Sequence, residues 1–223
     1  MNIAISLLTA AAIEAAGLFT VKKRFKKDEV KYTAKQRNLF IVVSSVIFAA
    51  LGVGLTLFAN PKEWTVFSVV RTLSVTYWTY FAAVVDVKLK IIPNELIIGM
   101  LAELALIFIP EAIYDFSEFR STLFMALLGG IVMGGVFLLA NALSKGGMGM
   151  GDVKTVFACG LFLGFESAAG MIFWALVLSV IAGVVLIAAK KAKLKSKLPM
   201  GPFFFGGAVI SNAIYIISGL NGG

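Results

Sequence analysis

Long apolar runs, separated by short polar segments, recur along the whole chain of 223 residues. A run of about 20 apolar residues is long enough to cross ~30 Å of hydrocarbon as an α-helix. The pattern therefore predicts an all-α, polytopic membrane protein with about eight transmembrane helices. The sixth run is the shortest, so it is either extended into its flanks or re-entrant. The expected spans are residues 2–21, 38–59, 65–85, 95–113, 120–143, 152–165, 167–189 and 203–218.

Composition supports the membrane assignment and narrows the chemistry. Apolar residues make up 60% of the chain and charged residues 14%, which excludes a soluble globule with a polar surface. The chain has no histidine and a single cysteine, Cys159. These counts exclude serine triads that use histidine, histidine-ligated zinc and an intrachain disulfide. We therefore expect no cofactor and no metal. The groups that remain available for catalysis are carboxylates, hydroxyls, lysine, arginine and the backbone.

The distribution of basic residues predicts the topology. With eight spans, 17 of the 20 lysines and arginines lie on one side, and only Lys62 and Arg120 lie in the opposite loops. Basic loops are retained in the cytoplasm, so we expect an inner-membrane protein with both termini outside. The net charge of +8 then reflects orientation and contact with anionic lipid rather than a nucleic-acid partner. The basic side comprises residues 22–37, 87–94, 144–151 and 190–198 with Lys154.

Two aspartates lie where expected spans meet the basic side. Asp86 closes the third span, where the helix must stop before Pro93. Asp152 opens the sixth span after the glycine-rich segment 146–151, whose backbone can approach another chain closely. Such a pair suits an aspartyl hydrolase: one carboxylate takes a proton from water, and a protonated one polarises the scissile carbonyl. The structural alternatives are a helix cap for Asp152 and, for Asp86, an interfacial anchor paired with neighbouring lysines.

Three separated segments resemble motifs of the type IV prepilin peptidases, membrane aspartyl proteases that share a GxGD motif with preflagellin peptidases and presenilins. Asp86 followed by Ile-Pro-Asn at 92–94 is similar to the family's first aspartate and its IPN turn. Residues 148–154, Met-Gly-Met-Gly-Asp-Val-Lys, resemble the MGxGDxK segment, and residues 198–203 resemble the PxGP element. The resemblance extends from about residue 80 to the C-terminus, with the motifs in the family's order.

The resemblance implies a membrane aspartyl endopeptidase with its core at residues 80–223, preceded by N-terminal transmembrane helices and a basic cytoplasmic loop at 1–79. Its substrate would be a prepilin-like precursor of a type IV pilus or protein-secretion system, cut between a short basic leader ending in glycine and an apolar helix. Many relatives also methylate the new N-terminus and carry paired Cys-x-x-Cys motifs, which this sequence lacks, so we infer a peptidase-only member. The implied site residues are Asp86 and Asp152 for catalysis, and Gly149, Gly151, Pro199, Gly201 and Pro202 for substrate binding.

The helix ends suggest different roles for the two aspartates. Asp86 lies near a helix C-terminus, which disfavours ionisation, and Asp152 lies near a helix N-terminus, which favours it. We therefore expect the pair to share one proton, held more by Asp86, with Asp152 as the general base for water. Two other function classes remain: a proton-coupled or cation-coupled secondary transporter that uses the same aspartates, and a non-catalytic scaffold. Transporter sites favour the bilayer midplane and internal repeats, which argues against the former.

Three charged residues fall well inside expected spans, away from the span ends, where a charge is costly: Glu14, Arg71 and Glu103. Arg71 and Glu103 lie on consecutive spans that run in opposite directions, so we expect a buried structural ion pair between them. The functional alternative, which follows from the resemblance, is that Arg71 receives a carboxylate of the substrate helix. Glu14 requires a partner on another helix or a water-filled groove.

Overall fold

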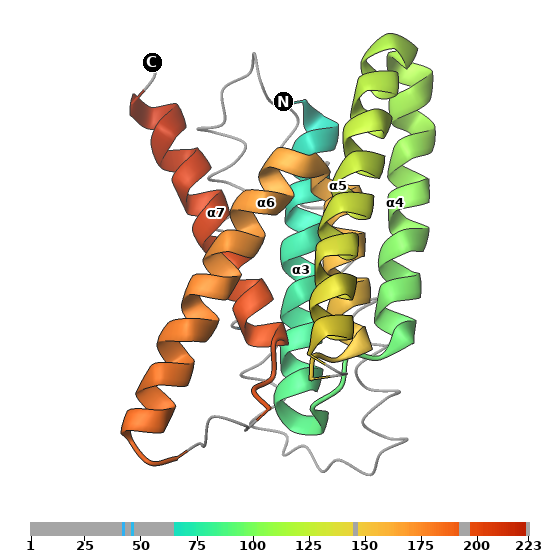
Figure 1. Ribbon diagram of the computed structural model, residues 1–223. Helices are drawn as coiled ribbons and strands as arrows, with labels where there is room; N and C mark the ends of the chain where they lie inside the picture. Colours follow the sequence, from blue (N-terminus) through green and yellow to red (C-terminus); the bar gives the residue numbers. More distant parts are fainter. Residues whose placement is uncertain (1–41, 43–45, 47–64, 145–146, 192–196, 222–223) are drawn as a thin grey trace.

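The computed structural model describes residues 65–144, 147–191 and 197–221 together with the isolated positions Val42 and Val46. Residues 65–221 within these ranges form α-helices and connecting loops, as the all-α prediction requires. The helices are α3 (Val66–Leu89), α4 (Asn94–Tyr114), α5 (Phe116–Leu143), α6 (Met150–Ala188) and α7 (Gly201–Asn221). They pack as one bundle, with α3 running through its middle (Figure 1). The main buried apolar cluster draws side chains from all five helices.

The eight expected spans are only partly reproduced. Among the described residues, four helices are long and apolar enough to cross a membrane, namely α4, α5, α6 and α7. The span expected at 65–85 is helical, as α3, but it does not belong to that group. The spans expected at 152–165 and 167–189 belong to one kinked element, α6. The spans expected at 2–21 and 38–59 lie outside the described residues.

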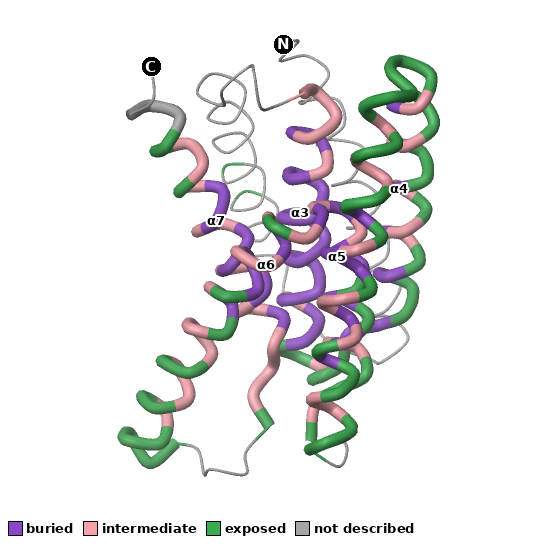
Figure 2. The backbone as a smooth tube through the Cα atoms, turned by 45° about the horizontal axis from the view of Figure 1, so that its top comes forward, coloured by how far each residue is buried: buried purple, intermediate pink, exposed green. Residues whose placement is uncertain are grey.

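Helix α3 is less apolar than the other four helices, and protein surrounds much of it. Of its 24 residues, 16 are buried, and Figure 2 shows the buried class along most of its length. The hydroxyls of Thr76 and Thr79 each donate to a carbonyl one turn earlier, which satisfies these two donors within the helix. At the start of the helix, the Thr65 hydroxyl accepts the Ser68 N–H at 3.2 Å. A helix enclosed in this way tolerates polar side chains that a lipid-facing helix would expose to hydrocarbon.

Helix α6 reverses direction at Gly164, where non-helical backbone (φ 74, ψ 178) joins two helical arms. A positive φ favours glycine, which explains the residue at this point. The first arm runs antiparallel to α5, and the second arm crosses α7 (Figure 1). At ~1.5 Å per residue the first arm, residues 150–163, rises about 21 Å, less than ~30 Å of hydrocarbon. The sixth expected span turns back before the far end of α5 (Figure 1).

Glycines allow the first arm of α6 to lie directly against α5. A Cβ added to Gly129 would lie 2.6 Å from the carbonyl oxygen of Gly160, and one added to Gly134 would lie 2.9 Å from the Cβ of Phe157. A Cβ added to Gly135 would meet nothing within 4 Å. Close helix packing, the usual role of small residues between membrane helices, is therefore found at Gly129 and Gly134 but not at Gly135.

Three described connections lie at the same end of the bundle. The connections α3–α4, α5–α6 and α6–α7 are at one end, whereas α4–α5 is at the other (Figure 1). This alternation agrees with the predicted threading of segments 87–94, 144–151 and 190–198. The expected basic loop at 22–37 and the expected intramembrane Glu14 lie outside the described residues.

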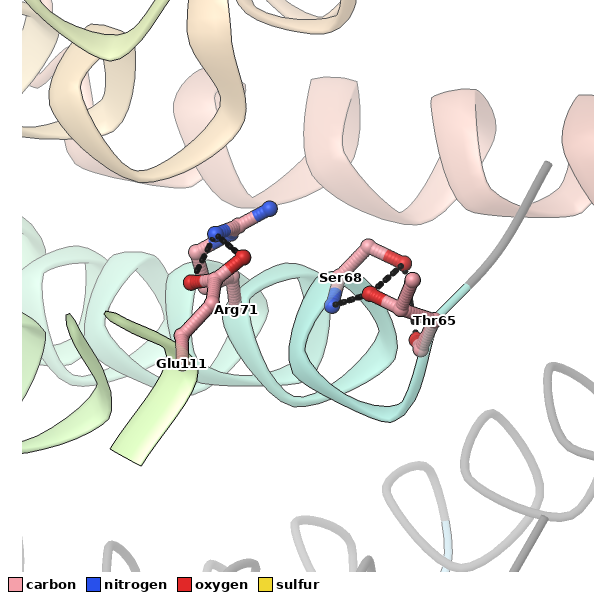
Figure 3. A network of polar contacts seen from close by, with 4 residues as sticks. All are labelled: Thr65, Ser68, Arg71 and Glu111. Carbon is pink, nitrogen blue, oxygen red and sulfur yellow. Dashed lines mark hydrogen bonds and ion pairs between the residues drawn. The ribbon is translucent and has the colours of Figure 1, made fainter. Parts of the chain in front are cut away.

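Arg71 pairs with Glu111, so the predicted pair of Arg71 with Glu103 is wrong. Nη1 of Arg71 donates to both carboxylate oxygens of Glu111, at 2.7 Å to Oε1 (Figure 3). Glu103 instead accepts hydrogen bonds from Ser74 Oγ, at 2.6 Å, and from Trp78 Nε1. The register of the α3–α4 hairpin decides this outcome, because Glu103 lies two turns, about 12 Å, from Glu111 along α4. Arg71 therefore has an internal carboxylate partner, which argues against its reception of a substrate carboxylate.

Candidate active site

Asp86 lies in the last turn of α3 and is 4% exposed. The helix ends because Lys90 adopts the left-handed conformation (φ 54) and donates its N–H to the Asp86 carbonyl at 2.8 Å. Pro93 follows in extended conformation as the N-cap of α4. The predicted helix stop before Pro93 is thus confirmed, and it leaves the Asp86 side chain buried at the end of the bundle that carries the three connections.

The start of α7 holds the Asp86 carboxylate. The Gly201 N–H donates to Asp86 Oδ2 at 2.8 Å, and a Cβ on Gly201 would lie 2.8 Å from the Cα of Ala83. Burial raises the pKa of Asp86, which lies just beyond the expected span 65–85, and the N–H groups of Gly201 and Met200 oppose that rise. Asp86 therefore sits at the C-terminus of one helix and at the N-terminus of another, so the helix-end argument for its protonation is incomplete.

Asp152 is the third residue of α6 and is partly buried. Its Oδ2 accepts the Gly149 N–H at 3.2 Å, which satisfies a backbone donor at the helix start. Asp152 thus has the capping role weighed as its structural alternative, although it acts from the third helical position rather than from the N-cap. Capping through one oxygen is compatible with chemistry at the other, because a carboxylate offers several acceptor positions.

Both aspartates line one open cavity of about 950 Å³ at this end of the bundle. They are close enough for the charge of Asp86 to act on Asp152. The structure therefore brings the two predicted catalytic residues together. Of the predicted substrate-binding residues, Gly149, Gly151 and Pro199 line the cavity, whereas Gly201 and Pro202 belong to the first turn of α7 and are not among its lining residues.

The cavity walls also include residues that sequence analysis missed. Ala140 and Ser144 come from the end of α5, and Ser179 comes from the second arm of α6. Small residues in apolar helices carry no signal of a site, and only the reversal of α6 brings Ser179 to this end. Lys90 and Lys197 also line the cavity. The sequence suggested Lys90 as a neighbour of Asp86 but identified Lys197 only as part of the basic side.

The Ile-Pro-Asn turn packs against the glycine-rich segment. A Cβ on Gly151 would lie 3.0 Å from the Ile92 Cβ and 3.1 Å from the Ile92 carbonyl oxygen. Lys154 Nζ donates to Asn94 Oδ1 at 3.0 Å. Gly151 therefore lines the cavity and also makes room for the protein's own Ile92. The three motifs that are separate in the sequence meet at one end of the bundle.

The arrangement provides the components of acid–base chemistry on a peptide. Two neighbouring carboxylates titrate as a pair, so one can be protonated while the other is ionised. The cavity volume of about 950 Å³ falls within the range of ordinary ligand pockets. Backbone N–H groups of Gly149 and Gly201 already engage the two acids, which orients them.

Comparison with known proteins identifies a family. A family model described as the type IV leader peptidase family matches residues 73–189, just over half of the chain. The match includes Asp86 and Asp152 and ends before Pro199. No curated protein and no solved structure matches the chain.

Proposed function

Because the chain belongs to the type IV leader peptidase family, we propose that it is an aspartic endopeptidase that removes the short basic leader from prepilin-like precursors. Its apolar helices indicate a membrane protein, and we assign it to the inner membrane. The observation that carries this proposal is the cavity that Asp86 and Asp152 share. That cavity lies at the helix ends, whereas transporter sites favour the bilayer midplane, which supports a peptidase over a secondary transporter.

In the proposed mechanism, a water molecule held between the two carboxylates attacks the carbonyl carbon of the scissile peptide bond. Asp152 takes a proton from this water, and protonated Asp86 donates a hydrogen bond to the scissile carbonyl oxygen. Asp86, at 4% exposed, is more buried than Asp152, and burial disfavours the ionised form, which supports Asp86 as the protonated member. Each carboxylate accepts a backbone N–H, from Gly201 for Asp86 and from Gly149 for Asp152, so these hydrogen bonds do not distinguish the two roles. The resting pair thus carries one shared proton, as general acid–base catalysis at a scissile amide requires.

Charge supports a cytoplasmic location for this end of the bundle. Lysines concentrate there in the described part of the chain, and basic connections are retained in the cytoplasm. We therefore place the cut at the cytoplasmic face, with the end of α7 on the opposite side. The described lysines at the cavity end are Lys88, Lys90, Lys154, Lys190, Lys191 and Lys197.

The apolar helix of the precursor has a direct route to the carboxylates from the lipid. Ala140 and Ser144 on α5 and Ser179 on α6 form walls of the cavity, and both helices also carry exposed apolar side chains. We propose that the substrate helix enters between these walls. A basic leader would be repelled by Lys90 and Lys197, so it lies beyond them, where anionic headgroups offset the lysine charge.

Cleavage by purified variants tests the proposal. Full-length protein in detergent or proteoliposomes is incubated with a prepilin-like precursor, and leader removal is followed by gel and mass spectrometry. We expect Asp86→Asn and Asp152→Asn each to lower the rate by about 10²–10⁴-fold, the usual contribution of a general acid or base. Glu118→Gln is the matched control, because it makes the same change at an exposed carboxylate in the first turn of α5, at the other end of the bundle.

The same set of variants defines the contrary result. Wild-type cleavage by a folded Asp86→Asn or Asp152→Asn variant would remove that residue from the mechanism. Uptake of protons or cations into proteoliposomes without any precursor, abolished by the same variants, would favour the transporter instead.

A further inference from the structure

The proposed reaction requires the two carboxylates to be held at a fixed separation. Asp86 and Asp152 belong to different helices, and the proposed mechanism requires both carboxylates to reach one water molecule. Their backbone partners fix each of them to a different element, Gly201 of α7 for Asp86 and Gly149 of α6 for Asp152. Neither of these hydrogen bonds joins the two acids to each other. The packing of α3, α6 and α7 brings the two acids to one end of the bundle. Contacts between the segments that follow Asp86 and surround Asp152 then fix their separation more closely.

The structure contains such a contact between the start of α4 and the start of α6. Lys154 Nζ donates to Asn94 Oδ1 at 3.0 Å, and Ile92, which is 8% exposed, packs on the side-chain-free face of Gly151. The first contact is polar and lies at the surface, whereas the second is apolar and lies beneath it. Together they fasten the short segment after α3 to the first turns of α6.

These contacts complete a path that links the two acids. The chain runs from Asp86 through the tight turn at Lys90 to Asn94, crosses to Lys154 through the hydrogen bond, and returns to Asp152 within two residues of α6. Residues two apart on an α-helix leave the axis about 200° apart. Asp152 and Lys154 therefore project from nearly opposite sides of α6, one toward the cavity and one toward α4. Lys154 reaches the chemistry through the placement of the helix start rather than by contact with the reacting atoms.

We propose that Lys154 and Asn94 are positioning residues that set the separation of the Asp86 and Asp152 carboxylates. This inference rests on the proposed peptidase function. It gives Lys154 a role beyond that of a positively charged anchor at the membrane surface, because an anchor requires only charge, whereas this role requires a donor at the Asn94 oxygen.

Steady-state cleavage by Lys154→Met and Asn94→Ala tests the proposal. We expect kcat to fall by about 10- to 100-fold with little change in KM, because a misplacement of about 1 Å has an effect of this size. Lys154→Arg keeps a donor and recovers most of the activity. The double variant falls no further than the more impaired single variant, because both changes remove one interaction. Lys88→Met is the matched control: it removes a lysine from the same end that takes no part in the contact, and it keeps the wild-type kcat.

The pH profile separates positioning from a general structural role. Coupling between the two acids spreads their apparent pKa values, and a larger separation weakens the coupling. We therefore expect the bell-shaped kcat profile to become narrower in Lys154→Met, while the thermal unfolding midpoint changes little because the bond is exposed. Asn94→Ala provides the same measurement from the other side of the bond if Lys154→Met folds poorly.

Three results would overturn the positioning role. The first is wild-type kcat in both Lys154→Met and Asn94→Ala, the second is an equal loss in Lys88→Met, and the third is a lower kcat with an unchanged pH profile. Each of these is distinct from failure of the proposed function, in which Asp86→Asn and Asp152→Asn cleave like the wild type.

Discussion

The two ends of α3 hold buried charge in opposite ways. Near the start of the helix, Arg71 meets Glu111, and their side chains are 11% and 8% exposed. In the last turn, Asp86 shares an open cavity with a second acid, Asp152. Breaking an opposite pair leaves an uncompensated buried charge, so the first arrangement serves the fold. Two carboxylates in one cavity repel each other when both are ionised, which destabilises the fold. Carboxylates with perturbed pKa values are typical of functional sites. One helix thus carries a structural pair at one end and a chemical pair at the other.

The largest expected effect comes from removing the proposed acid at the chemical end. Asp86→Asn should lower the cleavage rate by about 10²–10⁴-fold, because the amide cannot act as this acid. Stability should not fall in parallel, because a neutral amide replaces a protonated carboxyl and its oxygen can still accept the Gly201 N–H. Leader cleavage and thermal unfolding of the same preparation check the two effects. A large fall in the unfolding midpoint would mean that Asp86 serves the fold as Arg71 and Glu111 do.

The raised pKa of Asp86 adds a pH dependence with a definite sign. The folded protein binds this proton more tightly than the unfolded chain does, so stability rises as the pH falls through the folded pKa. In Asp86→Asn this rise should be smaller, because the titrating group is gone. Unfolding midpoints measured across the acidic range for both proteins check the sign. Equal slopes in the two proteins would contradict the burial of this acid.

At the end of α3 that carries Arg71, we expect a change to lower stability and leave cleavage intact. Glu111→Gln leaves the buried Arg71 charge without its partner and should destabilise the fold by about 3–5 kcal/mol. Cleavage at temperatures where the variant stays folded should remain near the wild-type rate, because the pair lies at the opposite end from the cavity. Thermal unfolding and cleavage check this together. Selective loss of kcat without loss of stability would show that the two ends of α3 are coupled.

A smaller effect is expected where α5 meets the first arm of α6. Gly129→Ala places a Cβ against the backbone of Gly160 and should destabilise the fold by about 2 kcal/mol. Gly135→Ala is the matched control, since a Cβ there meets nothing within 4 Å, and it should leave the unfolding midpoint unchanged or slightly higher. Similar losses in both variants would show that the contact between Gly129 and Gly160 is not the cause of the loss.

The smallest effect is expected in the middle of α3, between the two charged ends. Thr76→Val removes the oxygen that accepts the Asn212 side-chain N–H at 2.9 Å, and it should cost about 1 kcal/mol. Thr79→Val is the control, because the Thr79 hydroxyl donates only to carbonyls of its own helix, and its loss should be smaller. Equal unfolding midpoints for the two variants would show that the α3–α7 bond contributes nothing.

Some parts of the fold and site followed from the pattern along the chain. Apolar runs located α3, α4, α5 and α7, because hydrocarbon requires long, internally bonded helices. Helix stops and glycine-rich turns placed Asp86 and Asp152 at helix ends, and the lysine distribution placed those ends on one side. The turn at Gly164 falls within the sixth expected span because the pattern marks apolar runs and not the φ of single residues.

Other parts could not follow from the pattern. Lipid-facing and protein-facing sides of these helices are both apolar, so the sequence does not reveal which face of a helix meets which neighbour. The predicted partner of Arg71 was wrong for this reason, because the α3–α4 register selects Glu111 instead of Glu103. The resemblance assigned Gly201 to substrate binding, and only the packing of α7 against α3 revealed that its N–H donates to Asp86.

By itself, the sequence determined that helices cross a membrane and that two acids end up where spans meet its basic side. These properties depend on residue type and order, which act through transfer into lipid and through charge. Only tertiary structure decided that the acids share a cavity, which walls surround them and which hydrogen bonds orient them. Those properties depend on helix rotation, register and the reversal of α6, and such geometry arises when distant segments pack together.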